Sequence, residues 1–441
     1  MSAIPRYRSW HGPALFAAGY RPFFLLSALW AALAVPVWIA LFSGALTPSM
    51  ALPPMVWHVH EMVFGFGAAT VAGFLLTAIP NWTGRMPLQG LPLAGLAALW
   101  LAGRAACLAA GLIGPGAAMI ADLAFPAVFL AVVAREIIAG RNWRNLPMLG
   151  ALAALLIGNF LVHLAALGLG NTAELGNRLG VATLLALISL IGGRIIPSFT
   201  RNWLVKQRPD IALPAPFGMI DQAALALAIV ALVLFVIAPA SRTLPWAALA
   251  AGGTLALRLR RWRGWATWRE PLLFVLHLGY GWLACGFLVL GLGAFLPWLP
   301  QTTALHALTV GAIGTMTLAV MTRATLGHSG RPLTAGAGTT VIYTLVTLAA
   351  LIRLSAPFAG AQYLLALALA GAAWSAAFAL FAVLYGPLFI RPRARGGVPF
   401  PAKAHEKDQR RAIDHLHRLH APDPDVPCTL PGASGDGRGD C

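Results

Sequence analysis

Charged residues are scarce in this chain of 441 residues. Only 10% of them are Asp, Glu, Lys or Arg, whereas a soluble domain carries about 25%. Hydrophobic residues make up 59% of the chain, and its mean hydropathy is +0.76. So few charged side chains cannot cover the surface of several soluble domains. The composition therefore excludes a soluble protein and indicates an integral membrane protein.

Acidic residues are rarer still. The chain has 14 acidic and 31 basic residues, which gives a formal net charge of +17. Residues 391–441 contribute little of this charge, because their nine basic and seven acidic residues nearly cancel. The remainder lies in short segments between apolar runs, where membrane topology is its usual cause. A nucleic-acid partner is therefore not predicted.

Several motifs of redox and nucleotide chemistry are absent. The four cysteines form no CxxC or CxxCH motif, which excludes a thioredoxin-like centre and covalent haem attachment. No two histidines of one apolar run are 13 or 14 residues apart, and no two are adjacent. A cytochrome-b-like pair of stacked haems and an ordinary haem–copper oxidase site are thus not encoded. The sequence also lacks a Walker motif and a dinucleotide-binding glycine fingerprint in its proper context.

Long apolar runs dominate what is present. A membrane helix needs about 20 predominantly apolar residues, and the sequence predicts about twelve such spans. They lie near residues 15–42, 57–79, 91–113, 117–139, 148–170, 178–197, 217–238, 243–258, 271–298, 302–325, 338–356 and 360–390.

The basic residues predict the orientation of these spans. All but four of the 31 fall on the cytoplasmic side if the N-terminus is cytoplasmic, which places both termini in the cytoplasm. We therefore predict an all-α, polytopic helix bundle over residues 1–390. Residues 391–441 are polar and rich in proline and glycine, so we predict a disordered cytoplasmic tail there.

Histidines at the heads of two predicted spans are the first candidates for a site, because ionisable residues inside a bilayer are rare and usually functional. His58 and His60 open one span, and His306 opens another. Residues i and i+2 of a helix point about 200° apart. Either the two histidines lie in a non-helical turn, or they serve different partners. Glu61 and Met62 share the helix face of His58.

A weak internal repeat links the two spans. A shift of 246 residues aligns His60 with His306, Gly65 with Gly311 and Gly84 with Gly330. If the repeat is real, two histidine-headed helices face a shared outer cavity. Neutral imidazoles with a methionine suit haem iron and copper better than hard cations.

Three further polar residues near the membrane could have a role at this cavity or a purely structural one. Arg104 and Arg353 are candidate partners for haem propionates, but Arg104 is equally explained by neutralisation by Glu61 or Asp122. His163, taken alone, is better explained as a hydrogen-bonded packing residue.

Four segments resemble the signature segments of the NnrS family, in the same order. They are WHVHEMVFGFGAATVAGFLLTAIPNWTGR (57–85), GGRIIPSFTRNWL (192–204), HLGYGW (277–282) and HALTVGAIGTMTLAVMTRATLGHSGRPL (306–333). The resemblance extends from near Arg21 to the end of the last span. It implies a bacterial inner-membrane protein with non-covalent b-type haem and copper, linked to nitric oxide metabolism, denitrification and nitrosative stress. Nitric oxide is the ligand it implies.

The resemblance implies that the matching histidines are metal ligands, but it does not say which of them bind haem and which bind copper. They are His58, His60, His277 and His306, with His328, in a predicted cytoplasmic loop, and Met62 as weaker candidates. His277 either belongs to a second centre or hydrogen-bonds within the bundle, with Tyr280 as the expected partner.

Two other functions remain open. Twelve spans with both termini inside are typical of many secondary transporters, and the related helices could be elements of a transporter repeat. The scarcity of carboxylates in the spans disfavours that reading. A scaffold with structural histidines is the third interpretation. No catalytic reaction is predicted, and turnover, sensing and sequestration of nitric oxide stay open.

Overall fold

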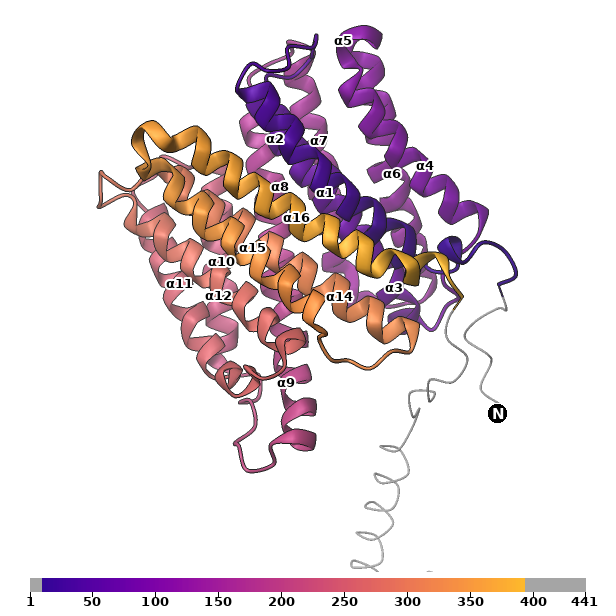
Figure 1. Cartoon of the computed structure of the whole chain (residues 1–441), viewed down its shortest axis with the longest axis vertical. Helices are drawn as coiled ribbons and strands as arrows, with labels where there is room; N and C mark the ends of the chain where they lie inside the picture. Colours follow the sequence, from indigo (N-terminus) through magenta and orange to yellow (C-terminus); the bar gives the residue numbers. More distant parts are fainter. Residues whose placement is uncertain (1–9, 393–441) are drawn as a thin grey trace, which may run out of the picture. The chain divides into compact units, whose positions relative to one another are not determined.

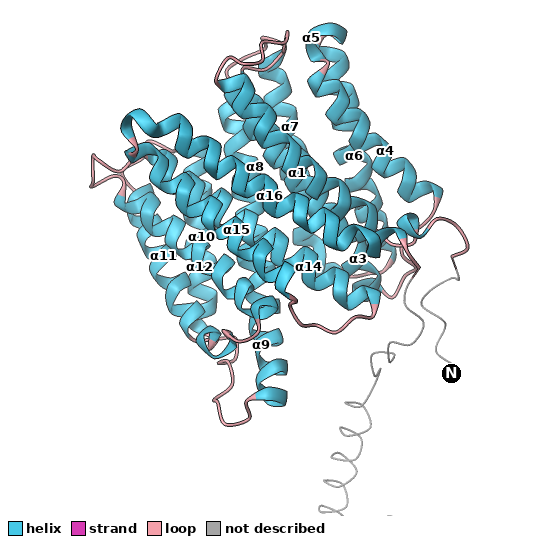
Figure 2. Ribbon diagram, viewed as in Figure 1, coloured by secondary structure: helices cyan, strands magenta, loops and turns pink. Residues whose placement is uncertain are grey.

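The computed structural model describes residues 10–392, which fold into helices joined by short connections (Figures 1 and 2). This described part contains no strand, which confirms the predicted all-α fold class. The predicted tail lies outside the described residues except for residues 391 and 392. The α-helices are α1 Tyr20–Phe42, α2 Pro54–His60, α3 Ala68–Thr83, α4 Leu91–Leu108, α5 Ala110–Ile113, α6 Pro115–Ala139, α7 Leu146–Ala166, α8 Ala173–Leu187, α9 Gly193–Gln207, α10 Met219–Ile237, α11 Leu244–Arg260, α12 Pro271–Leu292, α13 Gln301–His306, α14 Thr315–Ser329, α15 Ala337–Ser355 and α16 Tyr363–Ile390.

Eleven helical segments within residues 10–392 are long and apolar enough to cross a membrane. The eighth predicted span corresponds to α11, which has 17 residues and packs against α10 and α12. With α11 counted, the order along the chain gives the predicted twelve. The first and last helices, α1 and α16, also pack against each other. Arg21 of α1 fixes this contact by donating hydrogen bonds to the carbonyls of Phe389 and Arg391, at 2.9 and 2.8 Å.

Three spans are interrupted by π-helical segments. These segments are η2 Glu61–Gly67, η4 Ile188–Gly192 and η6 Ala307–Gly314. They continue α2 into α3, α8 into α9 and α13 into α14, and the resulting spans are the most buried of the eleven. Helix α8 contacts both η2 and η6, so the three interrupted spans meet inside the bundle. Such π-helical bulges occur frequently at functional sites. The remaining short segments are 3₁₀-helices: η1 Ala14–Phe16, η3 Trp143–Asn145, η5 Gly264–Thr267, η7 Ala356–Phe358 and η8 Gly360–Gln362.

The 246-residue repeat is visible in the boundaries of the helices. Shifting η2 by that distance gives residues 307–313, which matches η6 to within one residue, and α2 and α3 match α13 and α14 equally closely. Gly84 and Gly330 end the two spans with φ values of 70° and 77°. Glycine suits both positions, because left-handed backbone is costly for other residues. The structure thus supports an internal repeat of which the sequence retains few identities.

Candidate metal centres

His58 and His60 lie in different environments. Helix α2 is regular up to His60, so the two side chains point to opposite faces. Of the two alternatives from the sequence, the structure supports different partners. His58 lines a cavity inside the bundle, whereas His60 lies in a buried polar cluster.

The first candidate site is this cavity, which has a volume of about 400 Å³. Cofactor and ligand pockets commonly measure about 300–1,000 Å³. The walls come from α1, α2, η2, α8, α13, η6, α15 and α16, and most of them are apolar. Apart from two tryptophans, polar or metal-binding side chains are few among the lining residues: Met55, His58, Met62, Thr302, His306, Thr309 and Arg353.

The two histidines of the cavity are held in defined orientations. The ring of His58 stacks on Trp38 with centroids 4.0 Å apart, and its Nδ1 atom is buried without a hydrogen-bond partner. Nδ1 of His306 lies 2.7 Å from the carbonyl oxygen of Thr302. A carbonyl only accepts, so this nitrogen carries the proton and Nε2 keeps its lone pair. Metal-binding histidines are commonly oriented in this way.

Arg353 adds a positive charge to the apolar cavity. It comes from the last turn of α15 and is 8% exposed. One of its terminal nitrogens, Nη1, is buried without a hydrogen-bond partner. A buried donor without an acceptor is costly, which an anionic group in the cavity would relieve.

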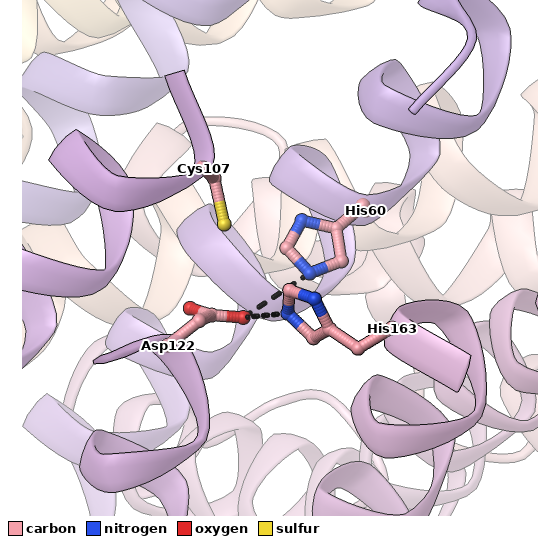
Figure 3. Close-up of side chains that lie close together, drawn as sticks. All are labelled: His60, Cys107, Asp122 and His163. Carbon is pink, nitrogen blue, oxygen red and sulfur yellow. Dashed lines mark hydrogen bonds and ion pairs between the residues drawn. The ribbon is translucent and has the colours of Figure 1, made fainter. Parts of the chain in front are cut away.

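The second candidate site is the cluster around His60 (Figure 3). His60, Cys107, Asp122 and His163 each offer a ligand atom, and these atoms lie within 4.8 Å of one another. The four side chains come from α2, α4, α6 and α7, and all are buried. Figure 3 shows both imidazoles pointing toward the carboxylate of Asp122, with the thiol of Cys107 facing the same space.

Asp122 is the centre of a hydrogen-bond network. Its Oδ2 atom accepts from Nδ2 of Asn159 at 2.8 Å and lies 3.0 Å from Nε2 of His163. The same oxygen is 3.2 Å from Nε2 of His60. The other oxygen, Oδ1, is paired with the guanidinium of Arg104.

Glu61 forms the opposite side of the same network. Its Oε2 atom accepts from Arg104 at 2.5 Å and from the indole of Trp30 at 2.9 Å. Its Oε1 atom lies 3.0 Å from Nδ1 of His60. Gly65 is needed beside this contact, since a Cβ atom there would lie 2.8 Å from Trp30 Nε1 and 3.0 Å from Glu61 Oε2.

The charge balance of the cluster determines which ions it can bind. Glu61 and Asp122 bring two negative charges, and Arg104 brings one positive charge. Both nitrogens of His60 face oxygens, because Nε2 is also 2.8 Å from Oδ1 of Asn159. A second positive charge, either a proton on His60 or a metal cation, therefore balances the network. Uncompensated buried charge is strongly destabilising.

The other predicted residues offer no ligand to either site. Arg104 is neutralised by Glu61 and Asp122, which is the second of its two alternatives, and it does not line the cavity. His277 hydrogen-bonds to the hydroxyl of Thr200 at 2.9 Å and not to Tyr280. The expected pairing is wrong because the Tyr280 hydroxyl reaches α11, where it accepts from Arg258 at 2.8 Å.

His328 lies in the last turn of α14 and not in the predicted loop. Its ring is 5.5 Å from that of Tyr20. His306 is 22 residues away along the same span, or about 33 Å at 1.5 Å per residue. His328 and His306 therefore cannot serve one centre.

Sequence reasoning missed half of the cluster. Cys107 belongs to no cysteine motif, His163 taken alone indicates packing, and Asn159 carries no sequence signal of its own. The position of these residues along their membrane spans is a signal that could have identified them. Cys107 ends α4, Asp122 is near the start of α6, and His163 is near the end of α7. Successive spans alternate in direction, so all three lie at one level, which is also that of His60.

Fold and sites together define a polytopic helical membrane protein with two buried candidate metal centres. The family model for NnrS protein matches residues 14–393, almost the whole described chain. The chain belongs to the NnrS family. It is thus a multi-pass membrane protein related to nitric oxide. No curated protein matches the sequence.

Proposed function

We propose that this protein binds a b-type haem in the cavity and copper in the His60 cluster, and that nitric oxide binds at the haem. It would act in the bacterial inner membrane, in the response to nitric oxide or in protection from nitrosative stress. The observation that carries the proposal is the cavity itself. Two histidines from repeat-related spans line an otherwise largely apolar space of cofactor size, with ring nitrogens not used by the fold.

The residues of the cavity fit a haem. His58 and His306 would hold the iron, and Arg353 would pair with a propionate, which gives its unpartnered Nη1 an acceptor. When bound, the haem would supply an iron atom that coordinates nitric oxide in place of one of the two imidazoles. The chain contributes the rest. Trp38 orients His58, Thr302 fixes the tautomer of His306, and the apolar walls exclude water.

The donor atoms of the cluster fit copper. Two imidazoles and a thiol are the ligand types that copper prefers over hard cations. A cation would also take the place of the proton that otherwise balances Glu61 and Asp122. His60, Cys107 and His163 would hold it, while Arg104, Trp30 and Asn159 keep the carboxylates in position.

An optical spectrum of the reduced, detergent-purified protein tests the proposal after haem-replete expression. We expect a haem Soret band that shifts when nitric oxide is added. A featureless spectrum from folded protein would contradict it. Metal analysis of the same sample tests the copper assignment independently.

A secondary transporter without a metal cofactor is the second candidate, favoured by the interrupted spans that meet inside the bundle. Its weakness is that Glu61 and Asp122 are both engaged with Arg104. Substrate-driven flux in vesicles containing haem-free, copper-free protein would support it.

A further inference from the structure

A second cavity, of about 80 Å³, lies where the three interrupted spans meet. Its walls come from η2 and α3, from the segment of α8, η4 and α9, and from η6 and α14. Thr70 and Thr317 are the only side chains with polar atoms in this lining. Both hydroxyls are already satisfied: that of Thr70 pairs with Ser27 at 2.6 Å, and that of Thr317 donates to the Gly314 carbonyl at 2.9 Å. The space therefore suits only an apolar guest.

The small cavity adjoins the large one. Leu184 and Ile313 line both cavities, so these two side chains form the partition between them. Gly67 lies beside this partition, and a Cβ atom there would be 2.7 Å from Cδ1 of Leu184. Glycine at this position therefore lets the Leu184 side chain pack directly against the backbone of η2.

The other side of the small cavity is bounded by partly exposed apolar side chains. They are Val71, Phe74, Ile188, Ile191, Ile195 and Val320. These positions lie near the middle of the spans Pro54–Thr83, Ala173–Gln207 and Gln301–Ser329. At that depth the surroundings of a membrane protein are hydrocarbon and not water. An opening there admits molecules dissolved in the lipid.

We propose that the small cavity is a passage through which neutral, apolar diatomic gases move from the bilayer interior to the cavity of His58 and His306. The proposal rests on the proposed function and specifies its ligand class. Nitric oxide, carbon monoxide and dioxygen would pass, whereas nitrite would not, because an ion loses its hydration in an apolar passage without compensation.

Two tryptophan variants at adjacent positions test the passage. Ile191 lines the small cavity, whereas its neighbour Leu190 does not, and both are partly exposed in the same π-helical segment. Ile191→Trp narrows the opening, and Leu190→Trp is the matched control. Val320→Trp narrows the opening from α14, in case Ile191→Trp fails to fold.

Two measurements are made on the full-length protein. In the haem-loaded protein, carbon monoxide recombination after photolysis should be about tenfold slower in Ile191→Trp than in Leu190→Trp, a barrier increase of about 1.4 kcal/mol. Xenon NMR should show less bound xenon in Ile191→Trp than in the wild-type protein or Leu190→Trp, because the signal from the small cavity is lost. Equal recombination rates in the two variants would overturn the passage. If the protein holds no haem, the proposed function fails, and equal amounts of bound xenon in Ile191→Trp and Leu190→Trp would separately overturn the passage.

Discussion

The cavity of His58 and the cluster of His60 differ in chemistry, although the two histidines lie only two positions apart on one helix. The cavity is largely apolar, and its histidines and Arg353 have nitrogens that the fold does not use. The cluster is polar, and nearly every donor in it meets an acceptor. The cavity is thus built to receive a large group, whereas the cluster is complete with a proton or one small cation. Opposite faces of α2 keep the two chemistries apart.

The largest effect is expected in the cavity. His306→Ala should abolish the haem Soret band of the purified protein, because it removes a nitrogen that the fold leaves free for iron. The control is His328→Ala in the same span, which should retain the haem. An unchanged Soret band in His306→Ala would show that the cavity binds haem by other residues or not at all.

The next effect concerns the stability of the cluster. Asp122→Ala leaves Arg104 with Glu61 alone, and breaking a buried ion pair costs about 3–5 kcal/mol. The thermal unfolding midpoint in detergent should fall markedly. Glu136→Ala on the same helix removes the partly exposed pair with Arg85, which is worth about 0–1 kcal/mol. Equal losses in the two variants would mean that the cluster does not stabilise the bundle.

A smaller loss of stability, caused by steric overlap, is expected where the His60 cluster contacts α1. Gly65→Ala places a methyl group against Trp30 and Glu61, and overpacking of this kind costs about 1–3 kcal/mol. Gly95→Ala is the control, because nothing lies within 4 Å of a Cβ atom there. That change should stabilise α4 by about 0.5–1 kcal/mol. Thermal unfolding of both variants measures the contrast.

The smallest effect on stability should come from Cys107→Ser. No hydrogen bond depends on the thiol among the described contacts, so unfolding should change little. Copper content, measured by elemental analysis, should nevertheless fall because a soft donor is lost. Undiminished copper in Cys107→Ser would exclude the thiol as a ligand and leave His60 and His163 as the copper ligands of the cluster.

The sequence predicted the architecture well and the sites in part. Apolar runs specify membrane helices almost directly, since backbone groups in lipid must pair within the segment. Helix geometry gave the separation of His58 from His60 as one of two alternatives, and the regular helix α2 supports it. The partners of His60 could not be predicted in this way, because Asp122, Asn159 and His163 lie 62 to 103 residues from it in sequence and meet it only when α6 and α7 pack. Likewise, the three-residue spacing of His277 and Tyr280 does not say which neighbouring helix each side chain reaches.

The haem and copper contents of two variants test most directly the central claim that the protein has two separate metal centres. Haem and copper are measured per protein in His58→Ala and in His60→Ala after identical expression and purification. We predict that His58→Ala loses haem and keeps copper, while His60→Ala loses copper and keeps haem. Loss of both metals in both variants, or of neither in either, would contradict the assignment of two separate centres to the two faces of α2.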